Sequence, residues 1–156
     1  MAHGILVAVC ASKERTEPKT DIGIGELRAG HGLVGDAHAG FSEREVSLIA
    51  YESILRARAE FGIDARPGCF ADNFAIQGLD FGAILVGDRI QVGAALLDVV
   101  QIGKPPEAPH TYDFQGVSLL REEGLFCRVL QGGRIQRGDL VTHMPTGHET
   151  RQEQTL

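Results

Sequence analysis

The sequence has few cysteines and no apolar N-terminal segment long enough for a signal peptide or a membrane span. Its three cysteines, Cys10, Cys69 and Cys127, are an odd number spread along the chain, so they do not form a disulfide framework. These shortages exclude a small secreted disulfide scaffold and a helical membrane protein. We therefore expect a protein of the reducing cytoplasm with no membrane partner.

Basic residues are also in the minority. The chain has 15 Lys and Arg against 21 Asp and Glu, which gives a formal net charge of −6 at pH 7. A nucleic-acid surface needs clustered Lys and Arg to neutralise phosphates, so we expect no nucleic-acid partner. An anionic ligand would have to be held by local groups, since the overall field repels it.

The length of 156 residues and a hydrophobic content of 43% are enough for one domain with its own core. We expect a single domain over residues 1–144. Residues 145–156 contain too few apolar side chains to pack, which predicts a disordered C-terminal tail.

The first half of the chain predicts short strands and one good helix. The apolar run 4–10 predicts a buried strand, and the polar run 12–21 predicts a mobile loop that carries Lys13 and Lys19. Residues 46–49 predict a strand, followed by a helix from about residue 50 to 61 that Gly62 ends. A capping-box pattern leaves open a helix that begins at Ser42.

The second half reads as strands and turns. Gly87-Asp88 predicts a hairpin between two short strands, residues 94–102 predict a strand buried on both faces, and a second hairpin is expected at 131–134. The prolines within 104–116 predict a loop. Because alternating helices are missing, the pattern favours a mainly β fold, a closed or nearly closed β-barrel with one or two short helices.

Cys69 is the first candidate for chemistry. It follows Pro67-Gly68, and a thiol on such a turn is expected near the surface, where a thiolate could accept sulfur or bind metal. The alternative is that Cys69 is a small buried hydrophobe. Cys127 lies in the alternating strand 125–130 and is expected in the core.

Asp36 and His38 lie in a stretch rich in glycine and alanine, residues 32–40, where the backbone can approach a ligand closely. Both side chains could converge on one ligand, with His38 as a hydrogen-bond or proton donor. The alternative is that Asp36 caps the turn and His38 is merely exposed. No metal site is predicted, because no Cys-x-x-Cys or His-x-x-x-His spacing accompanies this pair.

Five segments, in this order, resemble the MOSC domain family, which is named after the C-terminal part of molybdenum cofactor sulfurases. They are Gly-Leu-Val-Gly-Asp-Ala-His-Ala-Gly at 32–40, Arg-Glu-Val-Ser-Leu at 44–48, Pro-Gly-Cys-Phe-Ala-Asp-Asn at 67–73, Val-Gly-Asp-Arg-Ile-Gln-Val-Gly at 86–93 and the stretch from Gly124 to Asp139. The resemblance implies a β-rich barrel, binding of molybdenum cofactor (molybdopterin) or a related pterin, and a role in handling sulfur.

The resemblance also implies site residues. Arg44, Lys104 and Arg128 become candidate anchors for the phosphate of a pterin cofactor, and Asn73 a candidate partner for the edge of the pterin ring. For Asn73, capping of the turn after Pro67-Gly68 is the alternative.

Two positions depart from the family pattern. The family's cysteine in the loop after the strand 96–102 is missing here, where the loop reads Gly-Lys-Pro-Pro-Glu-Ala-Pro-His, and Asp72 replaces the usual glutamate. Cys69 is then the one cysteine expected to carry sulfur.

Three functions follow from the resemblance. In the first, Cys69 takes sulfur from a partner cysteine desulfurase and passes it to the cofactor or to a molybdoenzyme. In the second, the protein is a non-catalytic module that binds or delivers the cofactor. The third is a molybdenum-dependent reductase of N-hydroxylated compounds.

Overall fold

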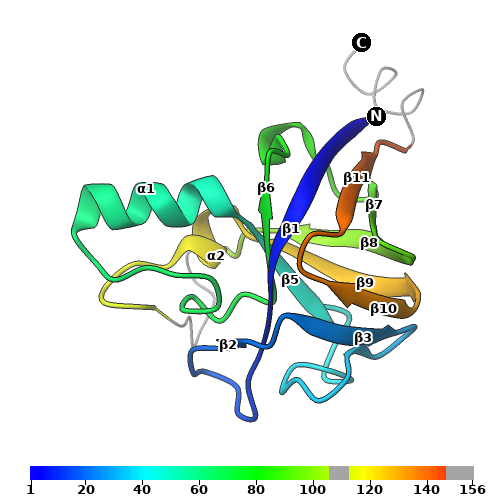
Figure 1. The fold of residues 1–156 in the computed structure, drawn as a ribbon, viewed down its shortest axis with the longest axis horizontal. Coiled ribbons are helices and arrows are strands. Elements are labelled where there is room, and N and C mark those ends of the chain that lie inside the picture. The colour runs from blue at the N-terminus through cyan, green and yellow to red at the C-terminus, as the bar shows by residue number, and fades with distance from the viewer. Residues whose placement is uncertain (106–112, 147–156) are drawn as a thin grey trace.

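The chain folds mainly into β-strands (Figure 1). The structure, a computed structural model, describes residues 1–105 and 113–146. Its strands are β1 Ala2–Ala11, β2 Thr20–Asp21, β3 Ile24–Arg28, β4 Gly32–Leu33, β5 Val46–Ala50, β6 Phe74–Gln77, β7 Arg89–Val92, β8 Ala95–Ile102, β9 Leu125–Gln131, β10 Gly133–Gln136 and β11 Leu140–Met144. Its helices are α1 Tyr51–Phe61, the short α2 Leu119–Glu123 and the single 3-10 turn η1 Phe81–Ala83.

Seven strands of the described chain close into a barrel, in the order β11, β7, β8, β9, β5, β6 and β1, with β1 pairing back to β11. Neighbours run antiparallel except β5 and β6, which are parallel because α1 crosses over between them. A smaller sheet of β10, β3 and β4 lies beside the barrel (Figure 1). The prediction of a closed or nearly closed β-barrel with one or two short helices is confirmed.

The core has two parts. One fills the barrel, with residues such as Leu6, Phe74 and Leu97 fully buried. The other lies outside the barrel wall, where Ile54 and Ala57 of α1 pack on Ala8, Cys10 and Ala75 and on the segment 65–70. Strand β1 therefore has buried residues on both faces, which explains its continuous apolar sequence.

The order of strand and helix at residues 46–61 is confirmed. β5 runs into α1 without a break, and Gly62 ends the helix with φ of 63°, a left-handed conformation that glycine adopts without strain. The alternative helix start at Ser42 is wrong. The Ser42 hydroxyl instead accepts a hydrogen bond from the Arg44 amide at 3.1 Å in a turn.

Both predicted hairpins are wrong. Gly87-Asp88 forms a turn, but the residues directly before it do not form a strand, and Leu85 and Val86 are exposed. The chain at 131–134 passes from β9 into β10, which pairs with β3 and not with β9. Strand β8 is also not buried on both faces, since Ala95, Leu97 and Val99 are buried and alternate with half-buried residues. A turn signal shows where a strand ends but not which strand it pairs with next.

Part of the sequence-based prediction lies outside the described residues. This holds for most of the proline loop, at 106–112, and of the predicted C-terminal tail, at 147–156. No helix within residues 1–105 and 113–146 is long and apolar enough to cross a membrane.

Candidate functional site

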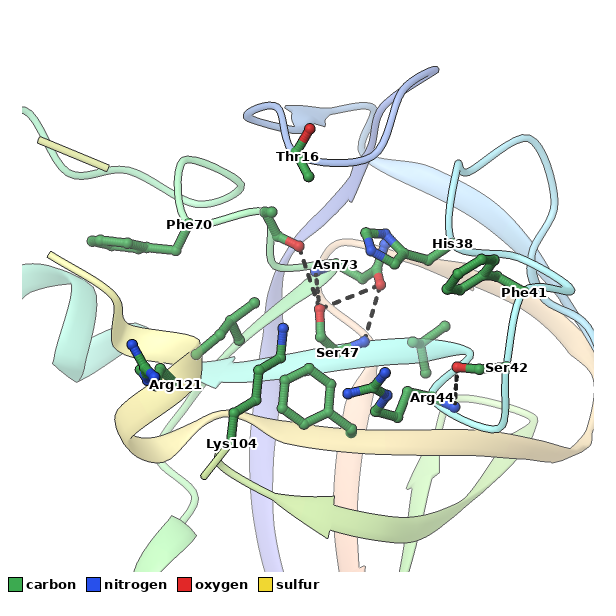
Figure 2. Close-up of a pocket in the computed structure, with 14 residues that line it drawn as sticks. Thr16, His38, Phe41, Ser42, Arg44, Ser47, Phe70, Asn73, Lys104 and Arg121 are labelled. Carbon is green, nitrogen blue, oxygen red and sulfur yellow. Dashed lines mark hydrogen bonds between the residues drawn. The ribbon is translucent and has the colours of Figure 1, made fainter. Parts of the chain in front are cut away.

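A pocket lies where segments from distant parts of the sequence meet (Figure 2). Its walls come from the loop before β2, the loop between β4 and β5, the start of β5, the segment before β6, the end of β8, α2 and β9. The cavity has a volume of about 110 Å³. The described residues that line it are Thr16, His38, Phe41, Ser42, Arg44, Val46, Ser47, Phe70, Ala71, Asn73, Lys104, Leu120, Arg121 and Phe126.

The charged lining residues are all basic. Arg44, Lys104 and Arg121 line the pocket, and none of its described lining residues is acidic, although the whole chain carries a net charge of −6. Burial lowers the pKa of Lys104, and the nearby charges of Arg44 and Arg121 lower it further. Three cations around one hollow create a local positive field, which would attract an anion.

Aromatic rings form much of the remaining wall. Phe41, Phe70 and Phe126 line the pocket, and the Lys104 ammonium lies 5.3 Å from the centroid of the Phe126 ring. This cation–π contact holds the ammonium at the wall. Flat apolar walls beside cations suit a ligand that is both planar and negatively charged.

Next to His38 lies a buried ion pair. The Lys19 ammonium donates to Asp36 Oδ1 at 2.7 Å, and both side chains are essentially inaccessible to water. Burial tends to raise the pKa of Asp36, but the hydrogen bond and charge of Lys19 outweigh it, so the pKa is lowered. The expectation that Lys19 belongs to a mobile loop is wrong, because this pair fixes it in the interior.

Asp36 does not line the pocket. Its carboxylate also accepts hydrogen bonds from the amides of Ser12, at 3.0 Å, and His38, at 3.3 Å. Asp36 therefore caps the turn, as the alternative interpretation holds, and also fastens two loops together. His38 does line the pocket and is half-buried. Burial and the Lys19 charge lower the pKa of His38 to about 4, which keeps the ring neutral at pH 7.

Asn73 lines the pocket, but its side chain holds strands together. Its Oδ1 accepts from the Ser47 amide at 2.9 Å (Figure 2). Its Nδ2 donates to the Cys10 carbonyl at 3.0 Å. The Asn73 amide in turn donates to Ser47 Oγ at 3.1 Å. These bonds connect β5 and β1 to the segment before β6. Asn73 therefore positions the part of the pocket wall that Ser47 and Ala71 form.

Cys69 is not near the surface, so that expectation is wrong. The residue is fully buried in the core cluster outside the barrel, and it does not line the pocket, although Phe70 and Ala71 do. Its Sγ accepts a hydrogen bond from the Arg66 amide at 3.4 Å. Burial raises the pKa of the thiol to about 11, and the opposing hydrogen bond from the Arg66 amide does not cancel this shift. Pro67 and Gly68 do bend the chain, but the bend turns Cys69 inward.

Asp72 explains the inward bend. This fully buried carboxyl accepts hydrogen bonds from the amides of Gly68, at 2.9 Å, and Phe70, at 3.2 Å. It holds the 67–72 turn against the core. Burial raises its pKa to about 6, although these amide bonds oppose the shift.

The three thiols are therefore expected to be protected in the folded protein. Cys10 and Cys127 are also fully buried, and burial raises the pKa of both thiols. At pH 8 we expect alkylation of the native protein to be more than about 100-fold slower than that of glutathione, because thiolate is scarce and access is blocked. Mass spectrometry would count modified thiols, with denatured protein as the control in which all three react.

The same measurement with a persulfide donor tests sulfur transfer. The prediction that Cys69 carries sulfur remains a prediction, and the geometry does not support it. Rapid modification of Cys69 alone in native protein would contradict the protection expected here and would favour that role.

Arg128 lies outside the pocket. Its guanidinium is half-exposed on β9 and donates to Asp98 Oδ2 on β8 at 2.9 Å. The pocket thus brings together four of the predicted residues, His38, Arg44, Asn73 and Lys104, and leaves out Cys69, Asp36 and Arg128. Sequence reasoning missed Arg121, Ser47 and the three phenylalanines, which carry no signal of their own until the fold assembles them.

The MOSC domain model matches residues 35–142, which is more than half of the chain. A comparison with curated proteins finds no match. Among solved structures, the chain is similar to the YuaD protein from Bacillus subtilis, with 18% identity, a TM-score of 0.72, and coverage of 92% of this chain and 97% of that one. It is also similar to YiiM from Escherichia coli, with 20% identity, a TM-score of 0.65, and coverage of 93% and 71% respectively. A third similar structure is YiiM from Geobacillus stearothermophilus, with 18% identity, a TM-score of 0.61, and coverage of 92% of this chain and 74% of that one. At these identities the neighbours establish the fold alone.

Proposed function

Because this chain belongs to the MOSC domain family, we propose that its pocket binds molybdenum cofactor or a related phosphorylated pterin. One observation carries the proposal: Arg44, Lys104 and Arg121 surround a hollow with aromatic walls, and none of its described lining residues is acidic. Arginine can hold a phosphate through two parallel hydrogen bonds, and lysine meets it as a point charge. The rings of Phe41, Phe70 and Phe126 offer surfaces for a flat heterocycle.

The residues fit the phosphate and the ring better than the metal. Within residues 1–105 and 113–146, no group of three or more His, Cys, Asp or Glu side chains could hold a metal ion. The protein would therefore receive molybdenum already held by the cofactor, which supplies any redox chemistry when bound. The chain itself would bind the phosphate, enclose the ring and offer the neutral His38 as a hydrogen-bond donor.

Between sulfur transfer and a non-catalytic module, the burial of the cysteines favours a module that binds or delivers the cofactor. Sulfur transfer needs a reactive thiolate at the ligand, and none of the three buried cysteines lines the pocket. Transfer through Cys69 would require the 67–72 turn to open, which would expose the Asp72 carboxyl. The third function, a molybdenum-dependent reductase, is tested by elemental analysis for molybdenum in the protein as purified.

A fluorescence titration with a phosphorylated pterin tests the proposal, with the dephosphorylated pterin as the matched probe. We expect the phosphorylated compound to bind at least about 10-fold more tightly, because hydrogen bonds between charged groups contribute about 1.5–3 kcal/mol each. Inorganic phosphate should compete, and added salt should weaken binding. Equal affinity for the two pterins, or no binding of either, would refute a phosphate site.

A further inference from the structure

We propose that Lys19 is a positioning residue that locks the His38 ring in one tautomer, so that the pocket presents a fixed Nε2–H donor to its ligand. The proposal rests on the proposed function, because it states how the pterin site recognises an atom of its ligand. Its first test, however, needs no ligand.

The lock follows from counting hydrogens on the Lys19 ammonium. This group has three N–H bonds, and it contacts three partners: Asp36 Oδ1 at 2.7 Å, Ser12 Oγ at 3.1 Å and His38 Nδ1 at 3.3 Å. The Ser12 hydroxyl donates its own hydrogen to the Glu14 carbonyl, so it accepts from Lys19. All three ammonium hydrogens are then used, and one points at His38 Nδ1.

An ammonium group can only donate, so His38 Nδ1 must be the acceptor. In a neutral imidazole the proton then resides on Nε2. No hydrogen bond to Nε2 forms among the residues that the structure describes, and His38 lines the pocket. Nε2–H is therefore the polar group that His38 can offer to a ligand. Figure 2 shows His38 on the opposite side of Ser47 from Lys104.

The charges around His38 keep this state over a wide range of pH. The groups that act on the ring are Lys19, Asp36, Lys104 and Arg15, and all but the Asp36 carboxylate are cations that disfavour a charged imidazole. Burial has the largest effect, and together with the three cations it lowers the pKa of His38 to about 4 against the opposing effect of Asp36. The site thus prefers a ligand atom that accepts a hydrogen bond, such as a ring carbonyl or a phosphate oxygen, over one that carries a hydrogen.

Lys19 is well suited to this role because both its backbone and its ammonium group are held in place. Its backbone amide donates to the Gly68 carbonyl at 2.8 Å, and its side chain ends in the buried pair with Asp36. The ammonium therefore cannot follow His38 if the ring turns away. Because the donor is already fixed, less conformational entropy is lost when a ligand binds than with a mobile donor.

Nitrogen-15 NMR of the imidazole in the full chain, without ligand, tests the lock. We expect the shifts of His38 to show a proton on Nε2 and none on Nδ1, with no titration from pH 5 to pH 8. In Lys19→Met the cation is gone and the Asp36 carboxylate remains, so we expect His38 to titrate inside that range and both tautomers to appear. Ser12→Ala removes a neutral partner of Lys19 and leaves the Lys19–Asp36 pair in place, so it is the matched control, in which the Nε2–H tautomer should persist.

A proton on Nδ1, or a wild-type His38 that titrates between pH 6 and pH 7, would overturn the proposal. If Lys19→Met does not fold, the wild-type spectrum still decides, because it reports the tautomer directly. Titration with the phosphorylated pterin separates this proposal from the proposed function. If the pterin binds and the ring carries its proton on Nδ1, only the lock fails. If the tautomer is as expected and no pterin binds, only the function fails.

Two variants, His38→Leu and His38→Gln, then test whether the ligand accepts a hydrogen bond from His38 Nε2–H. Loss of a neutral hydrogen bond should weaken binding of the phosphorylated pterin about 3- to 10-fold in His38→Leu. His38→Gln keeps an N–H donor and should recover part of that loss. Equal weakening in both variants would mean that His38 acts by shape and not by donation.

Discussion

Lys104→Glu is expected to weaken binding of the phosphorylated pterin by about 100-fold or more. The substitution removes a charge-assisted hydrogen bond, worth about 1.5–3 kcal/mol, and adds a carboxylate that repels the phosphate. Affinity for the dephosphorylated pterin should change much less, because the Phe126 and Phe70 walls remain. Fluorescence titration of both pterins measures the difference.

Folding should survive this change. In the native protein Lys104 lies near Arg44 and Arg121, which disfavour its charged form. A glutamate at this position would meet two cations and would relieve the repulsion, so we expect unchanged or slightly higher stability. A loss of binding can then be assigned to the site and not to unfolding.

Arg134→Glu is the matched control. Arg134 is exposed on β10 and does not line the pocket, and its replacement changes the net charge by the same amount. If both charge reversals weaken phosphate binding equally, the effect comes from the overall field of the protein, and the pocket is not an anion site. If Lys104→Glu has no effect, Lys104 does not contact the phosphate.

The architecture was accessible from sequence because its signals are local. Gly62 stops α1, and the apolar run of β1 is buried on both faces, so element types followed from periodicity and glycine positions. Strand partners were not accessible. The sequence around Gly132 predicts a hairpin turn, yet the following residues pair with β3. A Cβ at Gly132 would lie 2.4 Å from the Leu27 carbonyl oxygen, so glycine permits this close approach. That choice depends on a segment about a hundred residues earlier in the chain.

The site was accessible only in part. Arg44 and Lys104 were found through the family resemblance, and His38 through its stretch of glycine and alanine residues. The pocket contains all three. The exposure of Cys69 and Lys19 was misjudged because burial is a property of the assembled fold. Cys69 lies on a turn, which suggests exposure, but the Asp72 carboxyl draws that turn into the core. Lys19 lies in a polar run, which suggests solvent, but a carboxylate 17 positions away pairs with it inside.

Gly68→Ala is expected to lower the free energy of unfolding by about 3–5 kcal/mol, because it combines a strained backbone with a steric clash. Gly68 has φ of +90°, in the left-handed region, and a Cβ there would lie 2.3 Å from the Lys19 carbonyl oxygen. It would also lie 3.2 Å from the Cys10 Cβ. These neighbours are backbone and core atoms that cannot move aside cheaply. Equilibrium unfolding in urea measures the loss.

Gly87→Ala separates the two contributions. Gly87 has nearly the same backbone conformation, with φ of +95°, but no atom lies within 4 Å of the position of an added Cβ. Its replacement should therefore cost only the backbone strain, about 1–3 kcal/mol. The excess loss in Gly68→Ala measures how tightly the 67–72 turn packs on the Lys19 backbone. Equal losses in the two variants would show that this close approach is absent, and the fixed anchor that we assign to Lys19 would lose its basis.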